Sequence, residues 1–402
     1  MKIAVIGGGA AGFFAALSSK NHFPDAEVIL LEKTQKTLAK VKVSGGGRCN
    51  VTHACFNISE LAGFYPRGGK QLKKSFGIFN TTHTVEWFTK RGVELKTEAD
   101  NRMFPASNES QTIIDCLVRE SENLNIEIKL GFPVDELKKE ERFIIYSNEE
   151  KHEFDYVIVA TGGSPKRSGF DWLSSLNHDI IDPVPSLFTF NMPGENTAEL
   201  MGIVAPNAAV RIQGTNLQQQ GALLITHWGM SGPAVLKCSA WGARILHDMN
   251  YTFTSMVNWT GLANEELIRE AFSDTKTKHG KKKMSNENPF NITSRMWEYL
   301  LKKVEINPDL IWAELSKKEQ NRLINTLYND AYKVEGKTTF KEEFVTCGGI
   351  ALSDVNMSTM ESRKCPGLFF AGEVLDIDGV TGGFNFQAAW TTGFIAGKLG
   401  KG

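Results

Sequence analysis

The N-terminus of the chain combines a short apolar segment, a glycine-rich turn and a helix-compatible segment, and few folds begin in this way. Residues 2–6 are mostly β-branched and apolar, residues 7–12 are Gly-Gly-Gly-Ala-Ala-Gly, and residues 13–19 are compatible with a helix. The first glycine of such a run permits a tight turn, the second lets the backbone approach a pyrophosphate, and the last lets the helix pack closely on the strand. The pattern predicts a nucleotide site at the positive end of a helix. Its lining residues are Gly7, Gly9, Ala10, Ala11 and Gly12.

An acidic residue follows at the spacing that a dinucleotide site requires. A second strand is expected over residues 27–31, and Glu32 comes directly after it. A carboxylate there accepts hydrogen bonds from ribose hydroxyls and disfavours a ribose phosphate, so NADP is the less favoured nucleotide in this site. We therefore expect an α/β protein with a Rossmann-like domain.

Two later segments favour FAD over NAD. In each, a buried strand is followed by a glycine turn, the first at Thr161-Gly162 and the second at Gly372-Glu373. A carboxylate after the second strand can accept hydrogen bonds from the hydroxyls of an extended ribityl chain. Nicotinamide dinucleotides have no ribityl chain, so the combination predicts FAD.

A glycine pair also precedes an amphipathic stretch near the C-terminus. Backbone amides at the start of this stretch, Gly382-Gly383-Phe384-Asn385, could face the flavin and stabilise its anionic reduced form. With these motifs the chain resembles the large FAD superfamily whose FAD domain is like that of glutathione reductase. Glu373 stands where that superfamily usually has Asp.

A run rich in glycine and cations lies between these motifs. Residues 42–50 are Lys-Val-Ser-Gly-Gly-Gly-Arg-Cys-Asn. The three glycines expose successive amides, while Lys42 and Arg48 supply cationic donors. This composition predicts an anion-binding nest.

Four motifs in the same order give a narrower resemblance that covers nearly the whole chain. They are residues 42–50, 99–105, 226–233 and 372–379. With them the chain is similar to a bacterial family whose members carry labels such as aminoacetone oxidase family FAD-binding enzyme or NAD(P)/FAD-dependent oxidoreductase. Asn101 departs from the family's usual glycine, but Asn tolerates the left-handed conformation that such a turn needs.

The resemblance also implies where FAD is bound. Glu32 and Lys33 would lie at the adenosine end, with Val134 beside the adenine. Residues 44–50 would border the pyrophosphate and the flavin, and Glu373 with residues 383–385 would line the ribityl chain and the isoalloxazine. Together with the nest, this adds the following candidate FAD contacts: Lys33, Lys42, Ser44, Gly45, Gly46, Arg48, Cys49, Asn50, Val134, Gly383, Phe384 and Asn385.

Because both ends of the chain carry FAD motifs, the middle must be an insertion. We expect a discontinuous FAD domain over residues 1–186 and 342–402, and an insert over residues 187–341 that caps the substrate site. The insert should be a small β-barrel or sheet followed by a short helical bundle, and a basic run at 276–283 should be a surface loop. Expected strands are 187–191, 208–213, 221–226 and 252–257, and expected helices are 265–272, 294–303 and 316–328.

Three side chains are candidates for chemistry, each with a structural alternative. His227, in a loop bounded by Gly and Pro, could transfer protons or simply bond to the backbone. Arg102 could anchor a substrate carboxylate or carbonyl, or pair with a nearby acidic residue such as Asp100. The Cys49 thiol could be activated by Arg48, but without a partner cysteine it is better explained as packing near the flavin.

Composition restricts the partners. The 402 residues include 45 basic and 46 acidic side chains, so the net charge of -1 favours a small-molecule substrate over nucleic acid or a membrane. The six cysteines have no CxxC or metal-ligand spacing, which indicates reduced thiols, no metal and a cytoplasmic protein. We expect an FAD-dependent oxidoreductase, either a reductase or dehydrogenase visited transiently by NAD(P)H, or an amine oxidase that uses oxygen. Two further alternatives, both less favoured, are a flavin-binding redox scaffold without turnover and a flavoprotein that modifies nucleic acid.

Overall fold

The computed structural model describes residues 1–195, 198–338 and 345–401. The chain divides into two compact units, Met1–Ser186 with Phe340–Gly402, and Leu187–Thr339. We call the first the FAD unit and the second the insert.

A seven-stranded sheet forms the centre of the FAD unit, in the order β20-β21-β22-β10-β1-β2-β6. The strands from β22 to β6 pair in parallel, while β20 and β21 add an antiparallel edge. The central strands are runs of buried apolar residues, as expected for a parallel sheet covered on both faces. The strands are β1 (Lys2–Ile6), β2 (Glu27–Glu32), β6 (Glu127–Leu130), β10 (Tyr156–Val159), β20 (Val355–Asn356), β21 (Glu361–Ser362) and β22 (Leu368–Phe370).

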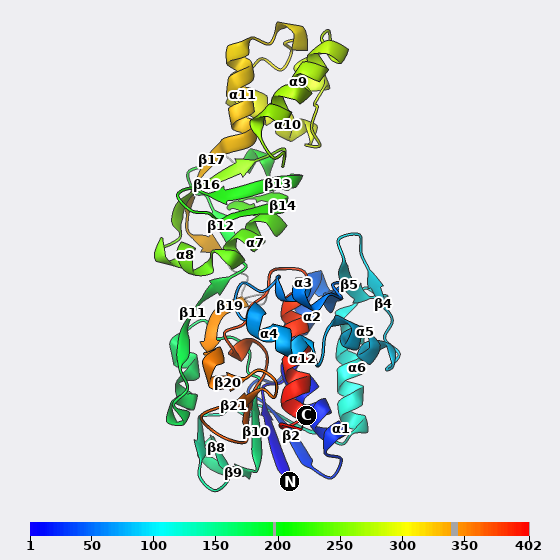
Figure 1. Ribbon diagram of the computed structural model, residues 1–402, viewed down its shortest axis with the longest axis vertical. Coiled ribbons are helices and arrows are strands. Elements are labelled where there is room, and N and C mark those ends of the chain that lie inside the picture. The colour runs from blue at the N-terminus through cyan, green and yellow to red at the C-terminus, as the bar shows by residue number, and fades with distance from the viewer. Residues whose placement is uncertain (196–197, 339–344, 402) are drawn as a thin grey trace. The chain divides into compact units, whose positions relative to one another are not determined.

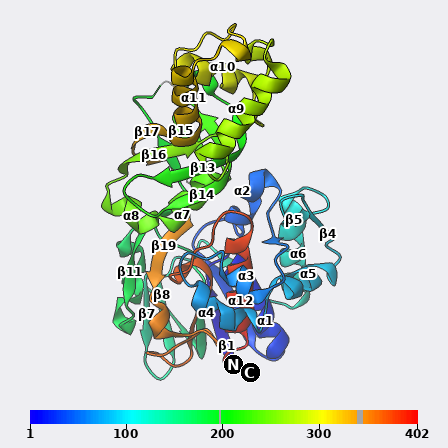
Figure 2. The same ribbon diagram turned by 45° about the horizontal axis from the view of Figure 1, so that its top comes forward.

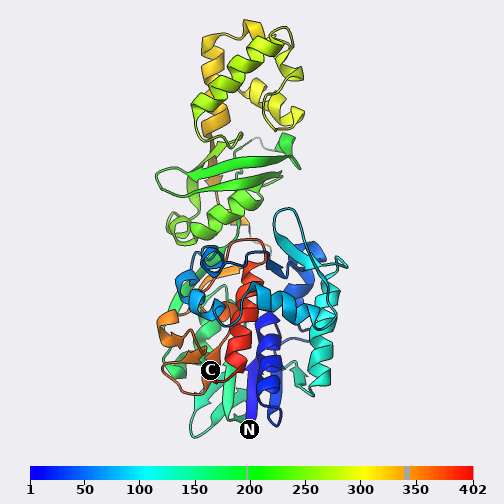
Figure 3. The ribbon, with the colours of Figure 1, turned by 45° about the vertical axis from the view of Figure 1, so that its right-hand side comes forward.

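Two helices from opposite ends of the chain pack together on this sheet (Figures 1 and 3). Gly393 and Gly397 of α12 lie against the backbone of α1, and a Cβ at either position would collide with a carbonyl oxygen of α1. The close approach therefore depends on glycine. The helices of this unit are α1 (Ala10–His22), α2 (Ala39–Gly47), α3 (Ile58–Ala62), α4 (Gly69–Phe76), α5 (Thr81–Thr89), α6 (Ser110–Asn123) and α12 (Phe384–Gly397), with 3-10 turns η1 (Arg167–Leu176), η5 (Leu352–Asp354) and η6 (Gly372–Val374).

Smaller sheets complete the FAD unit. One has the order β3-β5-β4, one has the order β7-β8-β9, and β11 pairs antiparallel with β19 at the two points where the chain leaves and re-enters the unit. Their strands are β3 (Thr52–His53), β4 (Leu95–Thr97), β5 (Arg102–Pro105), β7 (Glu136–Lys139), β8 (Phe143–Ser147), β9 (Glu150–Phe154), β11 (Ile180–Ser186) and β19 (Val345–Ile350).

The insert contains a seven-stranded antiparallel sheet in the order β17-β16-β13-β14-β15-β12-β18. Its two end strands, β17 and β18, are separated in the chain only by Gly336, an arrangement compatible with the expected barrel. The expected first strand from residue 187 is shorter than predicted, since Leu187 has a left-handed φ of 54°. The strands are β12 (Thr189–Asn191), β13 (Val204–Ile212), β14 (Gln218–Thr226), β15 (Gly229–Ser231), β16 (Thr252–Asn258), β17 (Asp330–Glu335) and β18 (Lys337–Thr338).

Helices α9, α10 and α11 lie in the chain between β16 and β17, so the expectation that the bundle follows the whole sheet was wrong. They form a bundle (Figure 2) packed around buried Trp297 and Trp312. Helix α9 extends to His279, so the prediction of a loop from residue 276 was wrong for the first part of the basic run. Cations in the last turn of a helix interact favourably with its dipole, which explains why the helix continues there. The helices are α7 (Pro233–Trp241), α8 (Ala243–Asp248), α9 (Glu265–His279), α10 (Ser294–Lys303) and α11 (Lys317–Asn329), with 3-10 turns η2 (Ala198–Leu200), η3 (Met284–Asn286) and η4 (Trp312–Glu314).

Candidate functional site

The carboxyl ends of four neighbouring parallel strands of the FAD unit carry the predicted nucleotide motifs. Strands β22, β10, β1 and β2 are adjacent in that order. Gly7 follows β1, Glu32 ends β2, Thr161 lies just after β10, and Gly372 lies just after β22. Ligands of open α/β sheets bind at this edge. The fold therefore brings together residues that lie more than three hundred positions apart in the sequence.

The first glycine turn has the geometry that a pyrophosphate needs. Gly7 has a φ of 113°, and Gly12 is so close to the Gly7 carbonyl that no side chain fits there. At Gly9, in contrast, an added Cβ would meet no atom within 4 Å. Gly9 is the N-cap of α1 and provides no side-chain cap, so the first backbone amides of the helix, at Ala10 and Ala11, are left to bind a group in this free space.

Hydrogen bonds hold the Glu32 carboxylate in place at the predicted adenosine end. Its Oε2 accepts a hydrogen bond from the backbone amide of Gly8 at 2.8 Å, and its Oε1 accepts two from Thr34 at 2.8 Å. The backbone amide of Phe132 donates to the Glu32 carbonyl at 2.9 Å, which brings the loop that contains Val134 beside Glu32. A carboxylate has about four acceptor positions, so ribose hydroxyls can still bind.

The glycine run at the C-terminal end of α2 departs from the helical conformation and forms successive left-handed turns. Gly45, Gly46 and Gly47 have φ values of 58°, 68° and 84°, and a Cβ at Gly46 or Gly47 would meet nothing within 4 Å. Ser44 leaves the helical conformation just before them, with a ψ of 147°. The Lys42 ammonium donates to Oε1 of Gln111 on α6 at 2.7 Å, so this side chain is bound to a neighbouring helix. Lys33 is exposed.

Two arginines near the nest share one carboxylate. Arg48 pairs with Glu98 Oε1 at 2.6 Å, and Arg102 pairs with Glu98 Oε2 at 3.2 Å and with Asp100 at 2.7 Å. The Arg48 guanidinium also lies 4.0 Å from the centre of the Phe104 ring. Arg102 thus pairs with nearby acidic residues, which is the structural one of the two roles considered for it.

Two residues next to these arginines have left-handed backbones. Asn101 has a φ of 65°, which confirms that Asn can replace the usual glycine there. Cys49 has a φ of 60° and is fully buried. Burial raises the pKa of its thiol to about 12, so Cys49 stays protonated and packs as an apolar group.

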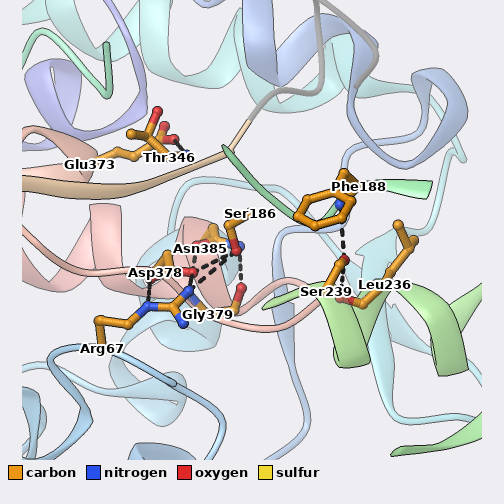
Figure 4. Close-up of polar contacts among 10 residues, drawn as sticks. All are labelled: Arg67, Ser186, Phe188, Leu236, Ser239, Thr346, Glu373, Asp378, Gly379 and Asn385. Carbon is orange, nitrogen blue, oxygen red and sulfur yellow. Dashed lines mark hydrogen bonds and ion pairs between the residues drawn. The ribbon is translucent and has the colours of Figure 1, made fainter. Parts of the chain in front are cut away.

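Glu373, at the predicted ribityl position, joins two elements (Figure 4). Its Oε1 accepts a hydrogen bond from the backbone amide of Thr346 at 2.8 Å, and its Oε2 pairs with Lys40 at 2.9 Å. The Thr346 hydroxyl is buried and has no hydrogen-bond partner among the described residues, as would suit a site that takes a hydroxylated chain. Thr346 and Lys40 were not predicted. Lys40 lies two positions before Lys42 on α2, so the two side chains point in different directions from the helix. For this reason Lys40 reaches Glu373, whereas Lys42 reaches Gln111.

The start of α12 is held by two asparagines. Gly383 precedes the helix with a φ of 95° and no side-chain cap. With its amide in the orientation that satisfies both groups, Asn50 accepts from the Gly383 amide and donates to the Thr52 carbonyl, each at 3.0 Å. Asn385 accepts from the Gly379 amide at 2.8 Å and donates to the Gly379 carbonyl at 3.0 Å (Figure 4). Both side chains therefore shape the backbone around Phe384.

A buried ion pair that was not predicted lies just before this turn (Figure 4). The Asp378 carboxylate is fully buried, pairs with the Arg67 guanidinium through both oxygens, and accepts a hydrogen bond from Ser186 Oγ at 2.7 Å. Burial raises the pKa of Asp378, although Arg67 acts in the opposite direction. The pair ties the loop before α12 to Ser186 at the end of β11. Ser186 is the last residue of the FAD unit before the insert.

His227 lies in the insert, in the two-residue turn between β14 and β15. Its side chain is exposed, and its ring centre is 4.1 Å from that of Trp228. Within the described part of the chain its ring makes no hydrogen bond to the backbone. The structure therefore presents His227 at a hairpin tip.

The residues at the sheet edge fit FAD. Free space faces the glycines at 9, 46, 47 and 162, an unpartnered hydroxyl lies beside Glu373, and two uncapped helix N-termini supply amides. These features define a Rossmann-like FAD-binding domain, as predicted. Residues 1–399 match the HI0933-like protein Rossmann domain, and the chain belongs to this family.

The curated relatives match over almost their full length. The chain is 27% identical to 3-dehydro-bile acid delta(4,6)-reductase of Clostridium scindens, a match that covers 99% of this chain and 98% of the relative. It is 28% identical to ribosomal RNA dihydrouridine synthase of Escherichia coli, covering 98% of this chain and 96% of the relative. These relatives confirm an FAD-dependent oxidoreductase. They do not support our expectation that nucleic acid is excluded as a partner.

Two of the solved structures that align with nearly the whole chain do so at low sequence identity. An E. coli quinol fumarate reductase FrdA variant aligns with a TM-score of 0.50 and 14% identity, covering 99% of this chain and 69% of that one. The 3-ketosteroid delta1-dehydrogenase of Sterolibacterium denitrificans aligns with a TM-score of 0.49 and 12% identity, covering 98% of each chain. In the part of the chain that the structure describes, no helix has the length and apolarity needed to cross a bilayer.

Proposed function

We propose that the chain is a flavin-dependent reductase of a carbon–carbon double bond conjugated with a carbonyl group. The observation that carries this proposal is the match, over 98–99% of the chain, to two relatives whose names describe one kind of chemistry. Making dihydrouridine from uridine saturates a ring double bond conjugated with a carbonyl. A 3-dehydro-bile acid with 4,6 unsaturation has double bonds conjugated with a ketone. Each reduction adds a hydride and a proton across such a bond.

The residues of the FAD unit can support this reaction. FAD, when bound and reduced, supplies the hydride. The amides that follow Gly383 at the start of α12 favour negative charge near them, and they would stabilise the reduced form of the bound cofactor. Glu373 and Thr346 would hold the ribityl chain, and the first turn of α1 would bind the pyrophosphate. We propose that the insert caps the substrate and that His227 supplies the proton.

We further propose that NADH or NADPH reduces the flavin by visiting it transiently. No second glycine fingerprint follows Gly163, because residues 164–169 are Ser-Pro-Lys-Arg-Ser-Gly and lack the GxGxxG spacing. Pro165 also interrupts the segment where the next helix would start. A dedicated nicotinamide domain is therefore not expected. The alternative, an amine oxidase, would draw its electrons from an amine and pass them to oxygen.

The test is an anaerobic experiment in two steps. Purified protein is mixed with NADH, NADPH or a primary amine, and the flavin absorbance is followed. The photoreduced protein is then mixed with a 3-oxo-4,6-diene steroid, with a uridine-containing fragment of ribosomal RNA, or with buffer. Rapid bleaching by a reduced nicotinamide and reoxidation by one of the unsaturated carbonyl compounds are expected. Bleaching by the amine, with neither compound reoxidising the flavin, would overturn the proposal.

A second substrate class, uridine within RNA, is favoured by one surface feature. Lys70, Lys73 and Lys74 are exposed on one helix, α4, and none forms an ion pair among the described residues. Such a set of cations suits phosphate groups, whereas a steroid needs no such surface. RNA that contains uridine is therefore our second candidate substrate.

A further inference from the structure

His53 lies beside the turn that leads into α12. It is half-buried on β3, and its Nδ1 is 3.1 Å from the carbonyl oxygen of Gly382. A carbonyl oxygen only accepts hydrogen bonds, so Nδ1 carries the proton and donates it. The imidazole therefore fixes the direction of the peptide group that precedes Gly383.

The ring of His53 also packs on the first residue of α12. Its centre is 4.6 Å from that of Phe384, with a 30° angle between the planes. Phe64 stacks on the same Phe384 ring at 4.3 Å and 16°, and lies 5.8 Å from His53. The three rings form one cluster, so the imidazole has little freedom to turn away from Gly382.

The neighbours of His53 on the chain contact the rest of the same turn. Asn50 accepts from the Gly383 amide, and a Cβ on Gly383 would lie 2.6 Å from the backbone of Thr52. Strand β3 is in turn paired with β5, with His53 opposite Arg102. Residues 50–53 therefore support the turn before α12. Among the described contacts, His53 is the only one of these residues whose side chain donates to Gly382.

We propose that His53 is a positioning residue that aligns the Gly382–Gly383 turn, so that the first amides of α12 face the flavin and set its reduction potential. The inference rests on the FAD site and is independent of which substrate the enzyme reduces. Amides at a helix N-terminus stabilise an anion more than a neutral group. A turn that relaxes should therefore destabilise the reduced, anionic flavin more than the oxidised one.

Two substitutions separate the hydrogen bond from the ring packing. His53→Phe keeps a ring against Phe384 and removes the donor, whereas His53→Asn removes the ring and keeps a donor near the position of Nδ1. His22→Phe is the matched control, because His22 also bonds to a backbone carbonyl through Nδ1, at 2.8 Å, and its ring contacts Phe394 of the same helix α12. All variants are purified as holoenzyme, and FAD content and Tm are recorded.

The measurements are the flavin reduction potential and the affinity for sulfite, which adds to oxidised flavins and generates an anionic product. His53→Phe should shift the potential to a more negative value and weaken sulfite binding by about 3- to 10-fold, the effect of one hydrogen bond. His53→Asn and His22→Phe should leave both values close to those of the wild type. Unchanged values in His53→Phe would overturn the proposal. Equal shifts in His53→Phe and His53→Asn, or loss of FAD from both with a lower Tm, would also overturn it, since they indicate a packing role only.

Discussion

The carboxylate of Glu32 accepts a hydrogen bond from the backbone amide of Gly8 at 2.8 Å. This contact joins the end of β2 to the glycine turn after β1, the two parts of the predicted adenosine site. Glu32 therefore holds the turn in shape. We propose that the same carboxylate would also accept hydrogen bonds from the ribose of FAD.

Replacing Glu32 by Ala should weaken FAD binding roughly 10- to 100-fold, the effect of losing hydrogen bonds to a charged group. Equilibrium titration of the apoprotein with FAD would measure this. Glu27→Ala is the control, because Glu27 begins the same strand, far from the glycine turn, and pairs only with Lys2 among the described residues. Equal affinity in the two variants would contradict the adenosine assignment.

Replacing Gly9 by Leu should abolish FAD retention. The Gly9 backbone has a φ of -93°, which any residue adopts, so the side chain would act only by filling the open space assigned to the pyrophosphate. Gly194→Leu is a matched control, since Gly194 also has no atom within 4 Å of an added Cβ and lies in the insert. Flavin absorbance per protein after gel filtration gives the answer, and chromatography of the released cofactor should identify FAD rather than FMN. Full FAD content in Gly9→Leu would exclude the pyrophosphate position.

Replacing Arg67 by Met should destabilise the protein by about 3 to 5 kcal/mol, because it leaves the Asp378 carboxylate buried without its partner. Urea unfolding at neutral pH would measure the loss. Adding Asp378→Asn to the variant should recover much of the stability, since the uncompensated charge is then removed. A double variant no more stable than the single one would contradict this explanation.

The stability lost in the single variant Arg67→Met should depend on pH. Burial raises the pKa of Asp378 in the folded state, and Arg67 opposes that rise. Without Arg67 the pKa should rise further, and a raised folded-state pKa means that stability is lost as pH increases through it. The difference in Tm between Arg67→Met and the wild type should thus be smaller at about pH 5 than at about pH 8. A difference that is larger in acid would contradict the assignment.

Replacing His227 by Ala should leave FAD content unchanged and lower turnover by about 10² to 10⁴-fold if His227 transfers a proton. Steady-state rates with the donor and acceptor found in the anaerobic experiment would show this. His247→Ala is the control, because His247 is another exposed histidine of the insert. Unchanged turnover would remove His227 from the reaction, and a lower Tm with lost FAD would make it structural.

Replacing Lys70, Lys73 and Lys74 together by Ala should weaken RNA binding and flatten its salt dependence. Each phosphate contact contributes about 0.7 to the slope of log affinity against log salt for single-stranded RNA, so the slope should fall by about 2. The triple variant of Lys302, Lys317 and Lys318, exposed lysines of the insert, is the control. An unchanged slope with continued reduction of the steroid would reject RNA as the substrate carrier while leaving the reductase proposal intact.

Local motifs made much of the FAD unit predictable. The turn at Gly7, a helix over residues 13–19 and a helix start after Gly382-Gly383 were expected because glycine spacing and apolar runs act over a few residues. The first helix begins earlier than expected, at Ala10. The same reasoning was wrong for Lys276 to His279, which continue helix α9. The basic composition of the run suggested a loop. In the structure these cations lie in the last turn of α9, where they interact favourably with the negative end of the helix dipole.

The sequence by itself determined the glycine turns of the predicted nucleotide site, since their conformations depend on residues that are neighbours in the chain. Only the tertiary structure decided which side chains meet. It brings Thr346 and Lys40 to Glu373, Arg67 to Asp378, and His53 to Gly382. These partners lie 27 to 333 residues apart. Contacts of this kind depend on strand order and helix packing across the whole unit, which no local pattern specifies.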